Sequence, residues 1–273
     1  MRTQILAPDA WLPELARFRS FQSALYPRSS IKLRDYHLRR FARWVGIPPY
    51  EVTWQMMLEH LDNPAWSTNT RRAARTSLAA FYRWAYLTEA TPTNLADRLP
   101  GIPIHQGKPR PATDEAVERA LASAPRRVQL MIRLGALAGL RCCEIAAVST
   151  TDLDRAHDGW RLRVIGKGGR ERVVPISSEL AGDIRAAGPG FVFPGAIDGH
   201  LSPGYVSKLI SRELPPGQTP HQLRHRFASR AYRGSGNNIR AVQELLGHAS
   251  VATTQIYTAV DSDELRRAAA AAA

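Results

Sequence analysis

Apolar residues recur at helical spacing along the first hundred residues of the chain. After Ser30, a candidate helix N-cap, the residues Leu38, Phe41 and Val45 fall on one side of a predicted helix. A second helical pattern begins at about Thr68. Its buried face is expected to contain four residues: Ala74, Leu78, Phe81 and Ala85. The first region of the chain is therefore predicted to be helical.

The second region combines helical and strand patterns. A helix is expected to begin at Asp114 after the cap residue Thr113, and a long apolar helix is expected from about Val128 to Val148. Two β-rich runs follow at 160–165 and 172–176, and the glycine-rich turn between them predicts a β-hairpin. Short helices and loops are expected after the hairpin. The predicted fold class is mainly α with a small β-sheet.

The segment between these regions is rich in proline and glycine. From Arg98 to Ala112 the chain contains four prolines and two glycines, a composition that sustains neither a helix nor a central strand. We therefore predict a helical domain at 1–97, an interdomain linker at 98–112 and a mixed α/β domain with a C-terminal tail at 113–273.

The charge favours a polyanionic partner. The chain has 37 Lys and Arg residues against 24 Asp and Glu residues, and its net charge is +13. Residues 1–105 contain 14 basic and 8 acidic residues, and residues 106–273 contain 23 and 16, so both regions are basic. Both are therefore expected to contact the phosphate backbone of a nucleic acid.

Arginines occupy the polar faces of the two helices predicted in the first region. These candidate DNA-binding residues are Arg39, Arg40 and Arg43 on the first helix and Arg71, Arg72 and Arg75 on the second. The second group is expected to be exposed, and its position near a helix N-terminus suits contact with phosphate. A solvated helix face is the alternative interpretation for any one of them.

Composition excludes several classes of protein. A hydrophobic fraction of 44% argues against wholesale disorder. The chain contains no run of eighteen apolar residues, so a membrane span is not expected, and the first thirteen residues lack the features of a signal peptide. The two cysteines, Cys142 and Cys143, are adjacent and make no disulfide framework. A cytoplasmic protein is predicted.

Five short motifs in the second region carry candidate chemistry. They are Gly139-Leu140-Arg141-Cys142-Cys143-Glu144, Lys167 in the hairpin turn, His221-Gln222-Leu223-Arg224-His225, Leu246-Gly247-His248, and Tyr257. Two guanidiniums can grip the oxygens of a phosphate and stabilise the charge of a transition state. Imidazoles and an ammonium can transfer protons, and a phenol can form a covalent intermediate. Together these groups suit attack on a phosphodiester without a metal.

Other interpretations of the same residues are weaker. His221, His225 and His248 could bind zinc, but no Glu follows His221 as a metalloprotease helix requires, so no metal site is predicted. The turn around Lys167 lacks the Walker spacing. Taken alone, Lys167 could be only a polar turn residue. However, only 4 of the 37 basic residues are lysines, which indicates a titratable amine at this position.

The ordered motifs resemble the signature of the tyrosine recombinase (phage integrase) family. That signature is Arg, Lys, His-x-x-Arg, His or Trp, and Tyr, in this order. The spacings of 9 residues from His248 to Tyr257 and 33 from Arg224 to Tyr257 also match it. The segment from Thr70 to Ala85 resembles the family's helical core-binding domain, so the resemblance covers nearly the whole chain.

The resemblance implies a role for each motif. Tyr257 would attack the scissile phosphate, leaving a 3′-phosphotyrosyl link and a free 5′-hydroxyl. Arg141 and Arg224 would clamp the phosphate, and Glu144 is expected to orient Arg141, one helical turn away.

Proton transfer would fall to the remaining residues. His221 and His248 would hydrogen-bond the phosphate or assist proton transfer, and Lys167 would act as general acid toward the leaving 5′-oxygen. The phosphotyrosine conserves the bond energy, so strand exchange through a Holliday junction is expected to need no metal, cofactor or ATP.

The resemblance also implies partners. The expected partners are double-stranded DNA with core attachment sites, further copies of the chain in a tetramer on DNA, and a directionality factor. Thr258–Arg267 is long enough to dock in a neighbouring protomer. The six C-terminal alanines could be a frayed helix end or a tag for a host protease. An additional arm-binding domain is not expected, a layout similar to Xer-type recombinases.

Three functions are compatible with these residues. A site-specific recombinase from a phage or mobile element is favoured. A type IB topoisomerase would use the same phosphotyrosine chemistry to relax supercoils, but the Arg-rich helical first region favours recombination. A catalytically idle DNA-binding regulator is the third possibility, and it would have no use for Tyr257.

Overall fold

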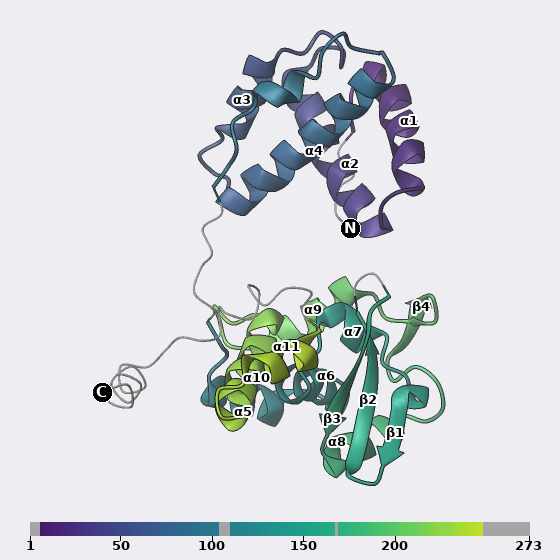
Figure 1. Ribbon diagram of the computed structural model, residues 1–273, viewed down its shortest axis with the longest axis vertical. Helices are drawn as coiled ribbons and strands as arrows, with labels where there is room; N and C mark the ends of the chain where they lie inside the picture. The colour runs from purple at the N-terminus through teal and green to yellow at the C-terminus, as the bar shows by residue number, and fades with distance from the viewer. Residues whose placement is uncertain (1–5, 104–109, 167–168, 248–273) are drawn as a thin grey trace, which may run out of the picture. The chain divides into compact units, whose positions relative to one another are not determined.

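The computed structural model describes residues 6–103, 110–166 and 169–247 (Figure 1). The chain divides into two compact units, Met1–Gln106 and Gly107–Ala273, which we call unit 1 and unit 2. The predicted fold class is confirmed, because the structure is mainly helical and contains a small antiparallel sheet. None of the described helices is both long and apolar enough to cross a bilayer.

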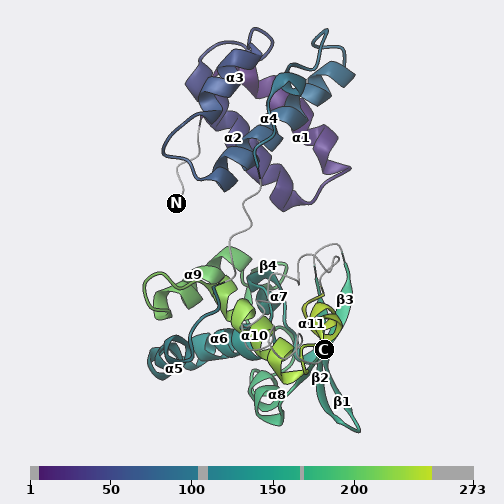
Figure 2. The ribbon, with the colours of Figure 1, turned by 60° about the vertical axis from the view of Figure 1, so that its left-hand side comes forward.

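The described part of unit 1 consists of helices and the loops that join them. Its elements are η1 (Asp9–Trp11), α1 (Leu12–Ser23), α2 (Arg28–Val45), α3 (Trp54–Leu61), α4 (Thr68–Leu87) and η2 (Leu95–Arg98). Polar caps set two of the helix starts. The Ser67 side chain accepts a hydrogen bond from the Thr70 amide at the start of α4, and the Thr53 side chain accepts one from the Met56 amide at the start of α3. Helix α4 packs on both α2 and α3 (Figure 2).

Aromatic side chains fill the core of unit 1. Trp11 stacks on Phe81 with ring centroids 5.5 Å apart, and it meets the edge of Phe41 at 5.8 Å. Phe18 also meets Phe81 edge-on, at 5.4 Å. These rings come from η1, α1, α2 and α4, so their packing joins elements from across unit 1.

The two helices predicted in this region are both present. The predicted start of α4 at Thr68 is confirmed, and its four predicted core residues are buried. The predicted cap at Ser30 is wrong, because α2 begins at Arg28 and Ser30 lies in its first turn. The reason is Pro27, whose extended backbone stops the helix from starting earlier and whose carbonyl accepts from the Ser30 amide at 2.9 Å.

Unit 2 contains one three-stranded sheet surrounded by helices. Its described elements are α5 (Asp114–Ser123), α6 (Arg126–Leu137), α7 (Cys142–Ala146), η3 (Thr150–Asp152), β1 (Leu153–Ala156), β2 (Gly159–Ile165), β3 (Glu171–Ile176), α8 (Ser178–Arg185), β4 (Pro194–Ile197), α9 (Pro203–Glu213), α10 (Pro220–Gly234) and α11 (Ile239–Leu246). The strand order is β1-β2-β3, all antiparallel, with Val164 opposite Arg172. The predicted hairpin is confirmed as β2 and β3, and strand β1 was not expected.

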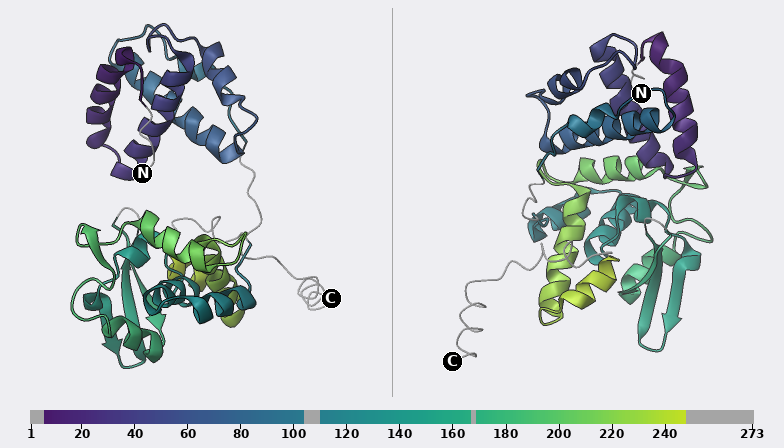
Figure 3. Two further views of the ribbon diagram at one scale, coloured as in Figure 1. Left: turned by 180° about the vertical axis from the view of Figure 1, so that it is seen from behind. Right: turned by 45° about the horizontal axis from the view of Figure 1, so that its top comes forward.

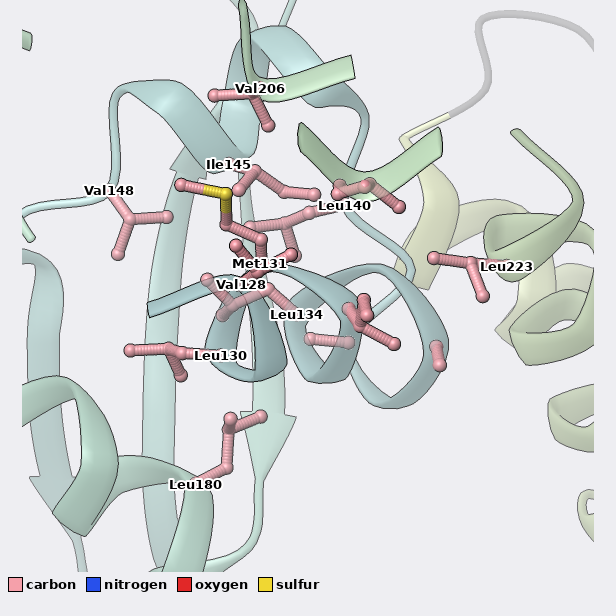
Figure 4. Packing of buried hydrophobic residues seen from close by; sticks show 14 of the residues in the cluster. Val128, Leu130, Met131, Leu134, Leu140, Ile145, Val148, Leu180, Val206 and Leu223 are labelled. Carbon is pink, nitrogen blue, oxygen red and sulfur yellow. The ribbon is translucent and has the colours of Figure 1, made fainter. Parts of the chain in front are cut away.

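Helix α6 lies at the centre of unit 2 and packs against α10, α5, α7, α8 and α9 (Figure 1). In both views of Figure 3, the teal strands of the sheet lie to one side of unit 2 and the yellow-green helices α10 and α11 to the other. Figure 4 shows Met131 and Leu134 of α6 surrounded by apolar side chains from the elements that pack on it. Ile145 comes from α7, Leu180 from α8 and Leu223 from α10, and all three are almost fully buried. The core therefore connects α7 and α10, which carry two of the candidate motifs.

The prediction of one long helix from Val128 to Val148 is wrong, because the helix is interrupted at Gly139. Helix α6 ends at Leu137, and α7 begins at Cys142. Gly139 adopts φ +66°, a left-handed conformation that suits glycine and ends a helix. The apolar pattern continues across the break because both helices bury residues in the same core, so periodicity alone did not reveal it.

Both ends of the predicted linker are packed into the units. Leu99 is buried in the core of unit 1, and Arg75 donates hydrogen bonds to the carbonyls of Leu99 and Pro100 at 2.8 and 2.7 Å. Ala112 is buried in the core of unit 2, and its amide donates to the Gln222 carbonyl of α10 at 3.0 Å. The connection between the units is therefore shorter than the proline-rich segment.

A buried histidine makes unit 1 sensitive to acid. The His60 ring packs against Phe41, Trp44 and Trp66 with centroid distances of 4.9 to 5.0 Å, and its Nε2 has no hydrogen-bond partner among the described residues. Burial, followed by the charges of Arg40 and His37, lowers the pKa of His60 to about 4. The folded state therefore holds the neutral imidazole below the pH at which the unfolded state takes up a proton.

We expect the thermal unfolding midpoint to fall as the pH is lowered from 6.5 toward 4. In this window the unfolded imidazole binds a proton that the folded one excludes, so stability is lost. Tryptophan fluorescence suits the measurement because five of the six tryptophans lie in unit 1. His60→Phe should make the midpoint less dependent on pH, whereas His157→Gln, at an exposed site, should not. An unchanged pH dependence in His60→Phe would contradict this assignment.

Candidate functional site

The described residues contain three of the six predicted catalytic residues, Arg141, His221 and Arg224, together with the predicted supporting residue Glu144. Arg141 and Glu144 lie at the start of α7, and His221 and Arg224 lie in the first turns of α10. The other three members lie outside the described residues: Lys167, His248 and Tyr257.

Arg141 is held at the start of α7 by Glu144. The Arg141 amide donates to Glu144 Oε2 at 2.8 Å, and Arg141 Nη1 donates to Glu144 Oε1 at 2.9 Å. The Arg141 backbone is extended, with φ −77° and ψ 158°, as expected of a residue that precedes a helix. Its side chain remains 34% exposed. Arg141 is therefore oriented by a buried carboxylate and still accessible from solvent.

Glu144 also contacts two further arginines. Arg172 of β3 makes a two-pronged contact with it, from Nη1 to Oε1 at 2.8 Å and from Nη2 to Oε2 at 2.7 Å. Arg224 Nη1 lies 3.6 Å from Glu144 Oε2. We call Arg141, Glu144, Arg172 and Arg224 the Glu144 cluster. One carboxylate among three guanidiniums leaves the cluster with an excess of positive charge.

Glu144 stays ionised despite its burial. Its side chain is 1% exposed, and burial by itself would raise the pKa of this carboxyl. The hydrogen bonds and charge of Arg172, the Arg141 amide and the charge of Arg224 outweigh burial, so the pKa of Glu144 lies below its usual value. The cluster therefore keeps its carboxylate charge at neutral pH.

Arg224 is fixed by the ends of two helices. It is 1% exposed; its Nη1 donates to the Gly139 carbonyl at 2.5 Å, and its Nη2 donates to the Leu246 carbonyl at 2.6 Å. These carbonyls follow α6 and end α11, where the last helical carbonyls lack partners within the helix. The guanidinium is therefore positioned by backbone atoms.

His221 lies at the second residue of α10, after Pro220. Its ring packs edge-on against His225 with centroids 4.3 Å apart. Burial, then the charges of Arg224 and Arg141, lowers the pKa of His221. Burial, then the charges of His221 and Arg224, lowers the pKa of His225 to about 4. Both imidazoles are therefore neutral at physiological pH and can each donate one hydrogen bond and accept another.

Arg172 was not among the site residues predicted from the sequence. The residue lies in the predicted strand 172–176 and shares its buried face with Val174, whereas Val173 points outward. A charged residue at an inward position of an alternating strand must find a partner, because an unpaired buried charge is costly. That alternation was the available signal, but the partner, Glu144, is 28 residues away in the sequence.

The six candidate DNA-binding arginines differ in what they contact. Arg39 pairs with Asp35 at 2.8 Å, and the Arg40 guanidinium lies over the ring of Trp66, 4.5 Å from its centroid. Arg43 is exposed on α2.

The three candidates on α4 are not exposed as predicted. Arg71, Arg72 and Arg75 are all partly buried. Arg71 donates to the Asn63 carbonyl at 3.2 Å, and Arg75 is bonded to the carbonyls at the start of the linker. For Arg71 and Arg75 the prediction failed because their guanidiniums bond to carbonyls of segments outside α4, which periodicity does not show.

Metal binding finds no support in the part of the chain that is described. No group of three or more His, Cys, Asp or Glu side chains there could hold a metal ion. The arrangement instead offers guanidiniums, backbone dipoles and neutral imidazoles, which suit the binding of an oxyanion such as a phosphate.

Comparison with known proteins gives one family. The model of the phage integrase family matches residues 112–264, more than half of the chain. The tyrosine recombinase XerA of Thermococcus kodakarensis is 30% identical over 258 residues, which cover 88% of this chain and 87% of that protein. The tyrosine recombinase XerC of Xanthomonas axonopodis pv. citri is 31% identical over 288 residues, covering 97% and 87%.

Solved structures share the fold. The XerH site-specific recombinase bound to a palindromic difH substrate matches with a TM-score of 0.72 and 19% identity, over 94% of each chain. A lambda integrase dimer bound to a COC′ core site matches with a TM-score of 0.71 and 20% identity, over 90% of this chain and 76% of that one. At these identities the comparison shows a common fold.

We expect Gly139→Ala to destabilise unit 2. A Cβ at this position would lie 2.4 Å from Phe227 Cδ1, and the left-handed backbone adds about 1–2 kcal/mol of strain for a non-glycine residue. Chemical unfolding followed by circular dichroism should show a loss of about 2 kcal/mol or more, since overpacking costs a further ~1–3 kcal/mol.

Gly204→Ala is the matched control for this change. Gly204 lies in α9 without a positive φ, and a Cβ added to it would meet no heavy atom within 4 Å. The control should be neutral or slightly stabilising, because alanine is the better helix former. Equal stability of the two variants would show that Gly139 does not define the break before Arg141.

Proposed function

The chain belongs to the phage integrase family and is a tyrosine site-specific recombinase; we propose that it cuts and rejoins DNA through a covalent link between a 3′-phosphate and Tyr257. The observation that carries this mechanism is the Glu144 cluster. It brings Arg141 and Arg224 together from separate helices and fixes both, one through a buried carboxylate and one through helix-end carbonyls. Preorganised guanidiniums of this kind stabilise the charge that develops on a phosphate under attack.

The proposed reaction has one bond forming as another breaks. The Tyr257 oxygen loses its proton and attacks the scissile phosphorus, and the bond from phosphorus to the 5′-oxygen breaks. Lys167 gives a proton to that leaving oxygen, and Arg141 and Arg224 hold the non-bridging oxygens. Attack by a 5′-hydroxyl of the partner strand reverses the step and releases Tyr257. Because the phosphotyrosine conserves the bond energy, this route needs neither ATP nor a metal.

The histidines fit this scheme as neutral groups. His221 lies at the start of the helix that carries Arg224, and its pKa is lowered by burial and by the two arginine charges. A neutral imidazole can accept a proton from the attacking phenol or donate a hydrogen bond to the phosphate. We propose that His221 and His248 share these tasks.

Double-stranded DNA is the proposed substrate, with core sites that the helical and catalytic regions contact together. Two proteins of similar structure are bound to DNA, XerH to its difH substrate and lambda integrase to a COC′ core site. A phage or mobile element is the proposed source, and the cytoplasm, at the nucleoid, is the proposed location. A directionality factor and a host protease that binds the terminal alanines remain proposed partners.

Covalent capture tests the nucleophile. The protein is mixed with its own genomic locus and host DNA and then denatured with detergent, and the DNA that stays attached is sequenced. We expect attachment at a few discrete sites, complete loss in Tyr257→Phe, and normal attachment in Tyr205→Phe, which alters an exposed tyrosine of α9.

The other outcomes of this capture identify the alternatives. Dispersed attachment together with relaxation of supercoiled plasmid would indicate a topoisomerase. Equal binding by the wild type and Tyr257→Phe without any covalent product would indicate a regulator.

Assembly is predicted to depend on DNA. We expect a monomer or weak dimer in solution and four protomers on two duplexes, with Thr258–Arg267 of each docking in a neighbour. Light scattering of Tyr257→Phe with and without the captured site would measure both states. A stable tetramer without DNA, or no complex larger than a dimer on paired sites, would contradict this assembly.

A further inference from the structure

Arg172 contacts several parts of the site through a single side chain. Its Nη1 and Nη2 hold the two oxygens of Glu144, and its Nε donates to the Leu245 carbonyl at 2.9 Å. The side chain is 6% exposed. It therefore joins β3, α7 and the last turn of α11, and it is too buried to contact DNA.

The same side chain touches the residue that precedes His248. Gly247 ends α11 with φ +62°, and a Cβ placed on it would lie 3.0 Å from Arg172 Cδ. Arg172 and Arg224 also bond consecutive carbonyls at this helix end, Leu245 and Leu246. The backbone at the end of α11, directly before His248, is thus held by two arginines of the Glu144 cluster, Arg172 and Arg224.

Arg172 and Glu144 also lie beside Gly166, the residue that precedes Lys167. A Cβ on Gly166 would lie 3.5 Å from Glu144 Oε1 and 3.8 Å from Arg172 Nη1. The Gly166 amide donates to the Arg170 carbonyl at 2.7 Å, which closes the hairpin directly beside this ion pair. The entry to the hairpin turn and the exit of α11 therefore lie against the same guanidinium.

We propose that Arg172 is a positioning residue for the reaction proposed above: it fixes the backbone at Gly166 and Gly247, and through them sets where Lys167 and His248 stand relative to Arg141 and Arg224. The role requires an arginine. Its planar fork can hold both oxygens of a carboxylate while Nε binds a carbonyl in a third direction, and a lysine ammonium cannot reach all three acceptors.

A second consequence concerns charge. With Arg172 in place, both Glu144 oxygens are occupied, and Arg224 stays 3.6 Å away on its helix-end carbonyls. Without Arg172, the carboxylate would attract Arg141 and Arg224 more strongly, at the expense of the phosphate. Loss of Arg172 should therefore slow the reaction. It should not weaken DNA binding, because the contacts that the protein makes with DNA away from the site are unchanged.

The test compares Arg172→Lys and Arg172→Gln with Arg133→Gln. Arg133 is the control because it is an arginine of unit 2 that is also largely covered, at 18% exposure, and ion-paired, with Glu179 and Asp183 on α8. The measurements are the single-turnover rate of covalent attachment to the captured DNA site, the affinity for that site and the thermal midpoint. We expect Arg172→Lys to lose up to about a hundredfold in rate, the loss that a misplacement of reacting groups by about 1 Å can cause. Its affinity should stay within about twofold, and Arg133→Gln should react at the wild-type rate.

A modified substrate separates positioning from a general loss of structure. When sulfur replaces the leaving 5′-oxygen, cleavage needs no proton donor, so a misplaced Lys167 no longer limits the rate. Arg172→Lys should then recover most of its deficit relative to the wild type. A wild-type rate on normal DNA would overturn the proposal, and a deficit that the sulfur substrate leaves unchanged would overturn its claim that Arg172 positions Lys167.

Absence of any covalent product with the wild type would refute the proposed function. Amide hydrogen exchange would still test the positioning role of Arg172 in that case. If Arg172 fixes Gly166 and Gly247, exchange at these two amides should be faster in Arg172→Lys than in Arg133→Gln. Equal exchange in the two variants would overturn the positioning role.

Discussion

The ion pair between Glu144 and Arg172 is the interaction on which the site depends. An isolated carboxylate buried to this degree would cost several kcal/mol, and so would an isolated buried guanidinium. Each therefore requires the other, and their pairing fixes α7 against β3. Because Arg141 and Arg224 contact the same carboxylate, the pairing that fixes α7 against β3 also places the two arginines proposed to bind phosphate around Glu144.

Helix ends complete this arrangement. The Leu245 and Leu246 carbonyls lie at the C-terminal end of α11, where no intrahelical N–H remains to bond them, and the Gly139 carbonyl lies in the turn after α6. Each accepts a guanidinium N–H of the cluster. The negative end of α11 is thereby directed at Arg172 and Arg224, while His221 lies at the positive end of α10. Backbone dipoles satisfy the buried arginines without adding further carboxylates, so the excess of positive charge at the site is preserved for a phosphate.

The sequence allowed the local features to be predicted, but not the distant pairings. The start of α4 and the hairpin follow from short-range signals, a cap and a β-rich pattern around a glycine turn, and both are present. The break at Gly139 was missed because apolar residues continue through it toward one core. Arg172 was missed because its partner lies in another element. The number of exposed arginines on α4 was overestimated because Arg71 and Arg75 bond to carbonyls outside α4. Lys167, His248 and Tyr257 rest on the order of motifs alone.

The arginines of unit 1 also differ in how many of their N–H donors are already bonded to protein acceptors. A guanidinium bonded to protein acceptors has fewer donors to offer a phosphate, and Arg75 is committed in this way to the start of the linker. Arg39 is likewise neutralised in part by Asp35. Arg40, Arg43 and Arg72 have no hydrogen-bond or ion-pair partner among the described residues, and the Arg40 guanidinium lies over the Trp66 ring. Because the salt dependence of DNA binding counts phosphates neutralised by such cations, we propose that the contribution of α2 and α4 to affinity falls mainly to these three arginines and not to all six.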